Sequence, residues 1–178
     1  HNNVATLTLV NSTISDNASA SGGGGIWNSS KYYGGTVRLL HCVISGNVAE
    51  TGAGVQNHGS LVQDDCRISD NISNGDGGGI YNSGSISLSR NIIVGNVATH
   101  GDGGAIYNWG SDIVLTDSTI SANTAESGGG IYFERGEPLV SNSTVSGNAA
   151  TSGDGGGIYA LDSGLKFINS TASGNSAV

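Results

Sequence analysis

One short motif returns along the whole chain at a nearly constant distance, and this period limits the fold more than any other feature. The motif is an aliphatic or small residue followed three positions later by asparagine, as in Ile14 and Asn17. Successive motif asparagines lie 24 to 30 residues apart. They are Asn17, Asn47, Asn71, Asn96, Asn123, Asn148 and Asn175. Such a period is typical of solenoids, propellers and repeat arrays, and periodic aliphatic residues exclude a disordered chain.

A second motif keeps phase with the first. It is a run of glycines that ends in an aliphatic residue, as in Gly23-Gly24-Gly25-Ile26 and Gly77-Gly78-Gly79-Ile80. Glycine allows a positive φ and lets backbone layers approach closely. The chain has 31 glycines but only one proline and no strict glycine triplet, which excludes collagen. Glycine therefore marks a repeated corner or a close contact between layers.

Each repeat also carries short segments with alternating aliphatic residues. Leu7 and Leu9 form one such pair, and Ser12 and Ile14 form a second pair after a slip of one residue. Alternation with period two predicts strands, and the slip predicts a corner at Val10-Asn11. The glycine run with its aliphatic residue would form a third side. The sequence predicts an all-β parallel β-helix of about seven coils, each of about 26 residues with three short strands.

Stacked coils turn equivalent residues into columns, because neighbouring strands lie about 4.8 Å apart. We expect the motif asparagines to form a structural ladder of stacked amides. Cys42 and Cys66 occupy one inward column. We predict two stacked, buried thiols there, with a disulfide as the alternative, since this spacing lies within the disulfide range. The repeats span residues 1–178, which we interpret as a single domain, either a segment or the mature part of a longer secreted chain.

The charge of the chain limits its partners. The formal net charge is −8, from 14 acidic and 6 basic residues. An acidic surface repels nucleic acid and anionic lipid, so we expect neither as a partner. No apolar run approaches the roughly 20 residues of a membrane-spanning helix, so we expect no membrane insertion by this segment.

The motifs resemble those of a known family. Gly103-Gly104-Ala105-Ile106 and the segments Asn11–Asn17 and Asn142–Asn148 are similar to repeats of the polymorphic outer-membrane proteins of chlamydiae and related bacterial surface proteins. In that family the asparagine motif usually begins with Phe, which Ile or Val replaces here. The resemblance implies a right-handed, pectin-lyase-like β-helix, export to the cell surface or the extracellular space, and adhesion. It carries no catalytic residues.

An enzyme acting on polysaccharides, a lyase or a glycoside hydrolase, is the main alternative. Such enzymes need clustered carboxylates, or acidic residues with a basic partner, on one face. His41, Asp65, Arg90 and Asp117 share a column next to the predicted corner. If the chain is an enzyme, the candidate catalytic residues are His41, Asp64, Asp65, Arg67 and Arg90. The competing interpretation, which we favour, is a surface ladder of alternating charges with no catalytic residue.

Aromatic residues follow the aliphatic residue of the glycine motif and, by alternation, point outward. Such a stripe can bind a carbohydrate or protein ligand, or can simply stack and stabilise neighbouring coils. A long insertion at Ser29–Gly35 adds two tyrosines at one end of the stripe. The candidate binding residues are Trp27, Tyr32, Tyr33, Tyr81, Tyr107, Tyr132 and Tyr159.

Two further hypotheses concern single columns. Asp76 and Asp102 precede glycine runs one coil apart and are weak candidates for a shared Ca²⁺ site, although turn formation also explains them. We expect no other cofactor or metal. Ice binding is a minor alternative, because a column with Thr13 and Thr119 begins a threonine array that Arg67 interrupts.

The preferred interpretation is an extracellular or cell-surface rod with a structural or adhesive role. A β-helix with open terminal coils exposes strand edges, which promote association. We therefore include end-to-end self-association into a fibre among the expected interactions.

Overall fold

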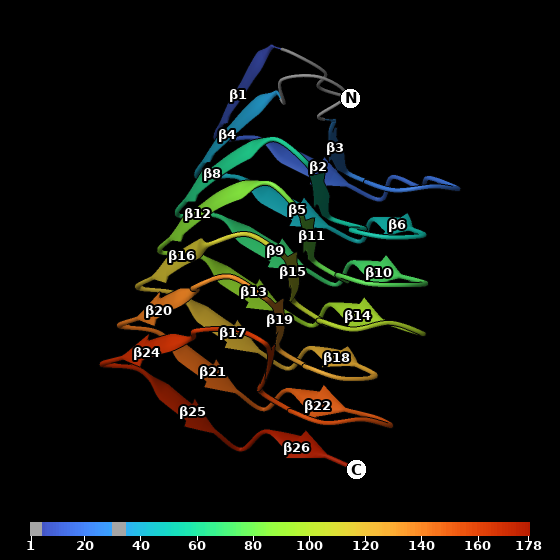
Figure 1. Ribbon diagram of the computed structural model, residues 1–178. Coiled ribbons are helices and arrows are strands. Elements are labelled where there is room, and N and C mark those ends of the chain that lie inside the picture. Colours follow the sequence, from blue (N-terminus) through green and yellow to red (C-terminus); the bar gives the residue numbers. More distant parts are fainter. Residues whose placement is uncertain (1–4, 30–34) are drawn as a thin grey trace.

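The computed structural model describes residues 5–29 and 35–178, and it shows a stack of coils that runs from one end of the chain to the other (Figure 1). The described residues form 26 strands and no helix. All strand pairs are parallel, and each strand pairs with its equivalent in the next coil. No described helix could cross a membrane.

The strands form four parallel sheets, so each complete coil has four strands. The first sheet contains β1 (Thr6–Val10), β4 (Thr36–Leu40), β8 (Ser60–Asp64), β12 (Ser85–Ser89), β16 (Ile113–Thr116), β20 (Leu139–Ser141) and β24 (Lys166–Ile168). The second sheet contains β2 (Thr13–Ser15), β5 (Val43–Ser45), β9 (Arg67–Ser69), β13 (Ile92–Val94), β17 (Thr119–Ser121), β21 (Thr144–Ser146) and β25 (Thr171–Ser173).

The other two sheets have six strands each. The third contains β6 (Val48–Ala49), β10 (Ile72–Ser73), β14 (Val97–Ala98), β18 (Thr124–Ala125), β22 (Ala149–Ala150) and β26 (Ser176–Ala177). The fourth contains β3 (Ile26–Asn28), β7 (Val55–Asn57), β11 (Ile80–Asn82), β15 (Ile106–Trp109), β19 (Ile131–Glu134) and β23 (Ile158–Leu161). Sheets of six and seven strands correspond to about six full turns.

The parallel β-helix predicted from the repeat is confirmed, but the expectation of three strands per coil was wrong. The additional strand is the third-sheet strand, which follows the motif asparagine directly. It has only two residues in every coil, for example Val48–Ala49 and Ile72–Ser73. Two residues are too short to show alternation, so this side resembles a turn in the sequence.

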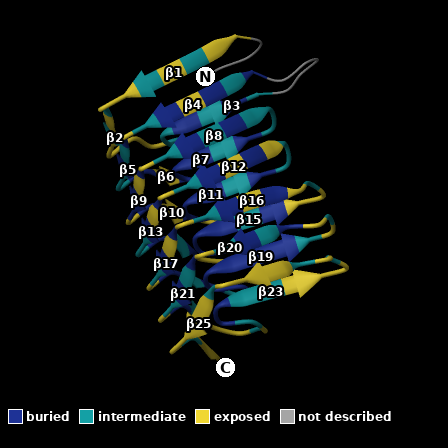
Figure 2. Ribbon diagram, turned by 90° about the vertical axis from the view of Figure 1, so that its left-hand side faces the viewer, coloured by how far each residue is buried: buried dark blue, intermediate teal, exposed yellow. Residues whose placement is uncertain are grey.

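The core is a set of in-register apolar columns inside the coils (Figure 2). Leu9 pairs with Leu39 on the first sheet, and Ile44 pairs with Ile68 on the second. Leu39, Ile44 and Ile68 are completely buried. Because most positions of a column hold aliphatic residues, a side chain packs against the equivalent residue in the coils on either side. The first and last coils have a neighbour on only one side among the described residues, and their inward side chains are correspondingly more exposed.

Left-handed backbone forms the corners. The corner between the first and second sheets places one residue per coil at a φ of 48° to 55°. These residues are Asn11, His41, Asp65, Arg90, Asp117, Asn142 and Asn169. Asparagine and aspartate tolerate this conformation better than most residues. The slip that predicted a corner at Val10-Asn11 therefore marks the position where the backbone changes direction.

The glycine runs form the corner between the third and fourth sheets. Gly77 has a φ of 66°, which a side chain would strain. A Cβ atom built on Gly78 would lie 2.5 Å from the carbonyl oxygen of Gly104 in the next coil. Both expected reasons for glycine, a positive φ and close layers, therefore occur side by side.

Candidate functional sites on the coil faces

The seven motif asparagines form a continuous hydrogen-bonded ladder. The Nδ2 of Asn71 donates to Oδ1 of Asn96 at 2.9 Å, and the backbone N–H of Asn71 donates to the same oxygen at 3.1 Å. The same double contact recurs at every step from Asn17 to Asn175. Each Oδ1 along the ladder thus satisfies a side-chain donor and a backbone donor from the preceding coil. This column is structural and faces the interior.

A second asparagine ladder lies on the fourth sheet, and the sequence reasoning missed it. Asn28, Asn57, Asn82 and Asn108 are completely buried. Their Nδ2 groups donate to the next Oδ1 at 2.6 to 2.7 Å. The available signal was an asparagine two positions after the aliphatic residue of each of these glycine motifs. The column changes at Phe133, which pairs with Asn108 and is completely buried.

The two cysteines are free and buried. Cys42 and Cys66 donate their thiol hydrogens to the carbonyl oxygens of Leu40 and Asp64, both at 3.3 Å. The backbone N–H of Cys42 donates to Sγ of Cys66 at 3.4 Å. Burial raises the pKa of the Cys66 thiol to about 11. A protonated, buried thiol is a poor nucleophile, so Cys66 acts as a packing group, and the buried Cys42 packs beside it.

Gln63 is an unusual residue in the column of core leucines. It pairs with Leu39 in the preceding coil and with Leu88 in the following coil. The residue is 1% exposed, and among the described residues neither its Nε2 nor its Oε1 has a hydrogen-bond partner. The alternation pattern marks this position as inward, but the sequence analysis did not single it out.

Four of the five candidate catalytic residues form pairs across neighbouring coils on the surface. Nδ1 of His41 lies 2.9 Å from Oδ2 of Asp65, and Arg90 forms an ion pair with Asp64. Both side chains of the first pair are more than half exposed. Arg67 lies on the second sheet and is exposed. This arrangement is a surface ladder in which acidic and basic side chains alternate, and exposed pairs of this kind contribute about 0 to 1 kcal/mol each.

The outward column proposed for ice binding lies on the second sheet. Thr13 aligns with Val43, and Thr119 aligns with Ile92. Arg67 lies between these two pairs, in the same column. The last three coils place Thr119, Thr144 and Thr171 side by side in this column. Among the described residues the threonine array is therefore confined to one end, since Val43, Arg67 and Ile92 separate it from Thr13.

Four tyrosines of the fourth sheet stack on one another along the outside of the coils. The ring centroids of Tyr81 and Tyr107 are 5.3 Å apart, those of Tyr107 and Tyr132 are 5.2 Å apart, and those of Tyr132 and Tyr159 are 4.9 Å apart. The planes differ by only 14° to 25°. Tyr132 is 8% exposed. The faces of these rings are therefore covered by neighbouring rings, and a sugar could stack on an inner face only if two rings parted.

The other candidate aromatic residues differ in position. Trp27 shares the tyrosine column but is separated from Tyr81 by Gln56. Tyr32 and Tyr33 lie outside the described residues. The tyrosine hydroxyls are partly enclosed, and Tyr107 donates a hydrogen bond to Oε2 of Glu134 at 2.9 Å. Burial is the main cause that raises the pKa of Tyr132 to about 12.

The two aspartates considered for calcium serve neighbouring backbone groups. Oδ1 of Asp76 accepts the N–H of Asp102, and Oδ1 of Asp102 accepts the N–H of Ser127, both at 2.9 Å. Burial raises the pKa of both carboxyl groups. Among the described residues, no group of three His, Cys, Asp or Glu side chains is placed to hold a metal ion. The contacts fit turn formation, and the calcium hypothesis stays a prediction.

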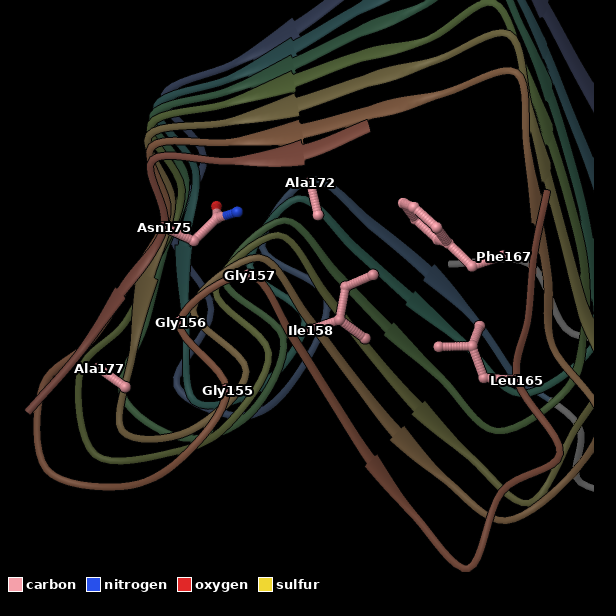
Figure 3. A pocket seen from close by; sticks show the side chains of 9 residues that line it. All are labelled: Gly155, Gly156, Gly157, Ile158, Leu165, Phe167, Ala172, Asn175 and Ala177. Carbon is pink, nitrogen blue, oxygen red and sulfur yellow. The ribbon is translucent and has the colours of Figure 1, made fainter. Parts of the chain in front are cut away.

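A cavity of about 440 Å³ opens at the last coil (Figure 3). Ile158, Leu165, Phe167 and Ala172 point into it. These residues belong to the inward columns that are filled by packing in the preceding coils. The cavity is therefore the interior of the solenoid, seen where the described coils end.

The fold and the ladders define a class of protein, the parallel β-solenoids with coils of about 26 residues. The family model for a right-handed beta helix region matches residues 31–178, and the chain belongs to this family. Residues 11–29 match the Chlamydia polymorphic membrane protein repeat. Together these findings indicate a surface-associated β-helical protein and confirm the family resemblance of the motifs. No curated protein and no solved structure gives a match to the chain.

Proposed function

We propose that this chain is an exported, rod-shaped element of a cell surface, where it has a structural and adhesive role. The observation that carries the proposal is the unbroken stacking of the coils. Two sheets and the first asparagine ladder run through all of them without a gap. A protein built this way resists bending and holds its outer faces at a distance from its attachment point. Such a shape suits a stalk that presents ligand-binding surfaces.

The arrangement of charges also favours this role over polysaccharide cleavage. Four of the five groups considered for catalysis pair with each other at the surface, and Nδ1 of His41 lies 2.9 Å from Oδ2 of Asp65. A general acid or base in a glycosidase needs a carboxyl group aimed at a bound substrate. Paired charged side chains on the surface contribute to solubility and to the contact between neighbouring coils.

The location is tested by labelling intact source cells with antibodies against the chain, with permeabilised cells as the control for total protein. We expect equal labelling with and without permeabilisation. Labelling that needs permeabilisation overturns the proposal.

The adhesive role is tested with microspheres coated with the full chain and placed on cell monolayers. Microspheres coated with a chain unfolded by denaturant and then adsorbed are the control. We expect attachment only with the folded chain. Equal attachment of both coatings, or depolymerisation of an acidic polysaccharide that is lost in Asp65→Ala and Arg67→Ala, contradicts the adhesive role.

A further inference from the structure

A hollow of about 410 Å³ lies on the outer surface at the corner between the fourth and first sheets. Ser83, Trp109, Gly110 and Arg135 line it. They come from three successive coils, next to the ends of β11, β15 and β19. Trp109 is 46% exposed, so part of its indole ring is open to solvent. This hollow involves none of the residues that the charge ladder or the tyrosine stack uses.

The hollow has a structural cause, which is a change in the length of one turn. Three residues separate Asn82 from Ile86, whereas four separate Asn108 from Ile113, although both pairs are aligned in register. The later coils keep the longer turn. The added residue moves the chain outward at Trp109 and Gly110, and the latter has a φ of 68°. The coil that contains Ser83 keeps the shorter turn, so a step forms on the surface between this coil and the coil that contains Trp109.

Arg135 forms the charged wall of this step. Its φ of 64° is uncommon for a residue other than glycine. Its side chain is exposed, and none of the ion pairs among the described residues involves it. Two neighbouring carboxylates are engaged elsewhere, because the hydroxyl of Tyr107 donates to Glu134 and Glu137 pairs with Lys166 at 3.0 Å. The guanidinium therefore stays available on a chain of net charge −8.

The opposite wall supplies neutral polar groups. The hydroxyl of Ser83 lies 2.6 Å from Nδ1 of His58, so its position is fixed by a neighbouring side chain. Burial lowers the pKa of His58, which favours the neutral imidazole. A hydroxyl held in this way can exchange hydrogen bonds with a hydroxyl of a ligand. The hollow thus combines an indole ring, a cation and a fixed hydroxyl.

We propose that this hollow binds one carboxylated sugar residue at the end of a glycan chain. The face of an indole packs against the C–H face of a sugar ring, and the guanidinium fork matches a carboxylate through two parallel hydrogen bonds. The small size of the hollow suits one sugar rather than a long polymer. This inference rests on the proposed adhesive function and names the class of ligand that it would use.

Saturation-transfer NMR with the full chain tests the site, with N-acetylneuraminic acid and glucuronic acid as probes. Glucose is the matched neutral control for glucuronic acid, and inorganic sulfate is added as a competitor to detect a simple anion site. We expect both acids to bind and glucose to bind at least tenfold more weakly. Equal binding of glucose, or complete competition by equimolar sulfate, overturns the proposal.

Two variants locate the binding. Arg135→Gln removes the charge, and Trp109→Ala removes the ring. Both side chains are exposed, so we expect unchanged circular dichroism and at least a tenfold loss of acid binding in each. Arg38→Gln, at an exposed arginine of the first sheet, is the control and should bind as the unmodified chain does. Unchanged binding in Arg135→Gln overturns the proposal even if Trp109→Ala does not fold.

Failure of the sugar site and failure of the proposed adhesive function give different experimental results. If Arg135→Gln loses sugar binding and microsphere attachment falls with it, both are supported. If the chain is at the surface and attaches to cells but binds neither acid, only the sugar site is overturned. If the chain is not at the surface, the adhesive function is overturned, whatever the isolated site binds.

Discussion

The two asparagine ladders use the same side chain in the same solenoid, but one continues to the end and the other stops. The first passes through every coil from Asn17 to Asn175. The second ends at Asn108, where Phe133 takes over. In the first ladder each Oδ1 along the column accepts a backbone N–H as well as a side-chain N–H. In the second ladder the donor from the preceding coil is the side-chain Nδ2.

This difference explains why an asparagine of the second ladder, but not one of the first, can be replaced by an apolar residue. An interior amide that must satisfy a backbone donor of the neighbouring coil cannot be replaced by an apolar side chain without leaving that donor unpaired. Among the described residues, no backbone N–H of the preceding coil bonds to an amide of the second ladder, whose Nδ2 groups donate to the next amide and to carbonyl oxygens of the adjacent turns. An apolar side chain can therefore replace such an amide without leaving a backbone donor of the preceding coil unpaired. The corner next to the second ladder also gains a residue at Trp109, whereas the turn before the first ladder keeps its backbone conformation.

The largest effect is expected where the second ladder ends. Phe133→Asn would restore the asparagine column by one step and give Asn108 a new partner. We expect it to destabilise the chain by about 4 kcal/mol, because the loss of a completely buried aromatic side chain outweighs one hydrogen bond. Urea unfolding measures the change, and Phe133→Leu is the control with a smaller loss. Equal stability of Phe133→Asn and Phe133→Leu would show that the second ladder can be extended by one asparagine without an additional loss of stability.

Removing one amide from each ladder compares them directly. Asn96→Ala leaves a backbone N–H and a side-chain N–H of Asn71 unpaired, and we expect a loss of about 3 kcal/mol. Asn82→Ala leaves the Nδ2 of Asn57 without its amide partner, and we expect about 2 kcal/mol. The same urea titration gives both values. If Asn82→Ala lowers the free energy of unfolding as much as Asn96→Ala, the two ladders do not differ in how much their amides stabilise the chain.

Gln63 offers the opposite test, since its interior amide belongs to no ladder. Gln63→Leu would complete the leucine column between Leu39 and Leu88. We expect a gain of about 1 kcal/mol, because a buried amide without partners is replaced by a side chain that packs. Gln63→Ala, which leaves a cavity, is the matched control and should not stabilise. A loss of stability in Gln63→Leu would mean that the amide has a partner in solution.

The smallest effect at neutral pH concerns the outer face of the fourth sheet, where the tyrosine stack continues past the end of the second ladder. The pKa of Tyr132 is raised to about 12, mainly by burial, from an ordinary value of 10.0. The neutral hydroxyl is therefore favoured by the folded chain. Stability should be unaffected below pH 10 and should fall as the pH rises toward 12.

Ultraviolet difference absorbance of tyrosinate, recorded together with circular dichroism, checks this expectation. Tyr107→Phe removes the hydroxyl that donates to Glu134 but keeps the ring in the stack. We expect this variant to retain the late ionisation of Tyr132. Ionisation of all tyrosines near pH 10 with the fold intact would contradict a packed stack.

Much of the architecture could be predicted from spacing alone. Residues such as Asn47 and Asn71 occupy one column because they recur at the coil period, and no knowledge of the corners is needed for that. The third sheet could not be predicted, since strands such as Val48–Ala49 are shorter than any alternation. The second ladder was present in the sequence as aliphatic-x-Asn but was hidden beside the more conspicuous glycine runs.

The hollow at Trp109 could not be predicted from the sequence for a different reason. It depends on one residue that this turn gains from Trp109 onward, and the coil period already varies by several residues. Only the strand register shows which turn lengthened. Similarly, the pairing of Asp64 with Arg90 depends on side-chain directions at a corner, which the residue columns do not specify.

The one-coil reach of the ladders has a consequence for how the chain acquires its structure. Each asparagine of the first ladder bonds to a partner 24 to 30 residues further along the chain. No contact in this ladder requires the two ends of the protein to meet. A polypeptide that emerges end first, from a ribosome or through a membrane pore, can therefore complete one coil as soon as the next has appeared. Structure in such a chain can therefore spread from coil to coil in sequence order, and each added coil fixes residues that were mobile before it formed.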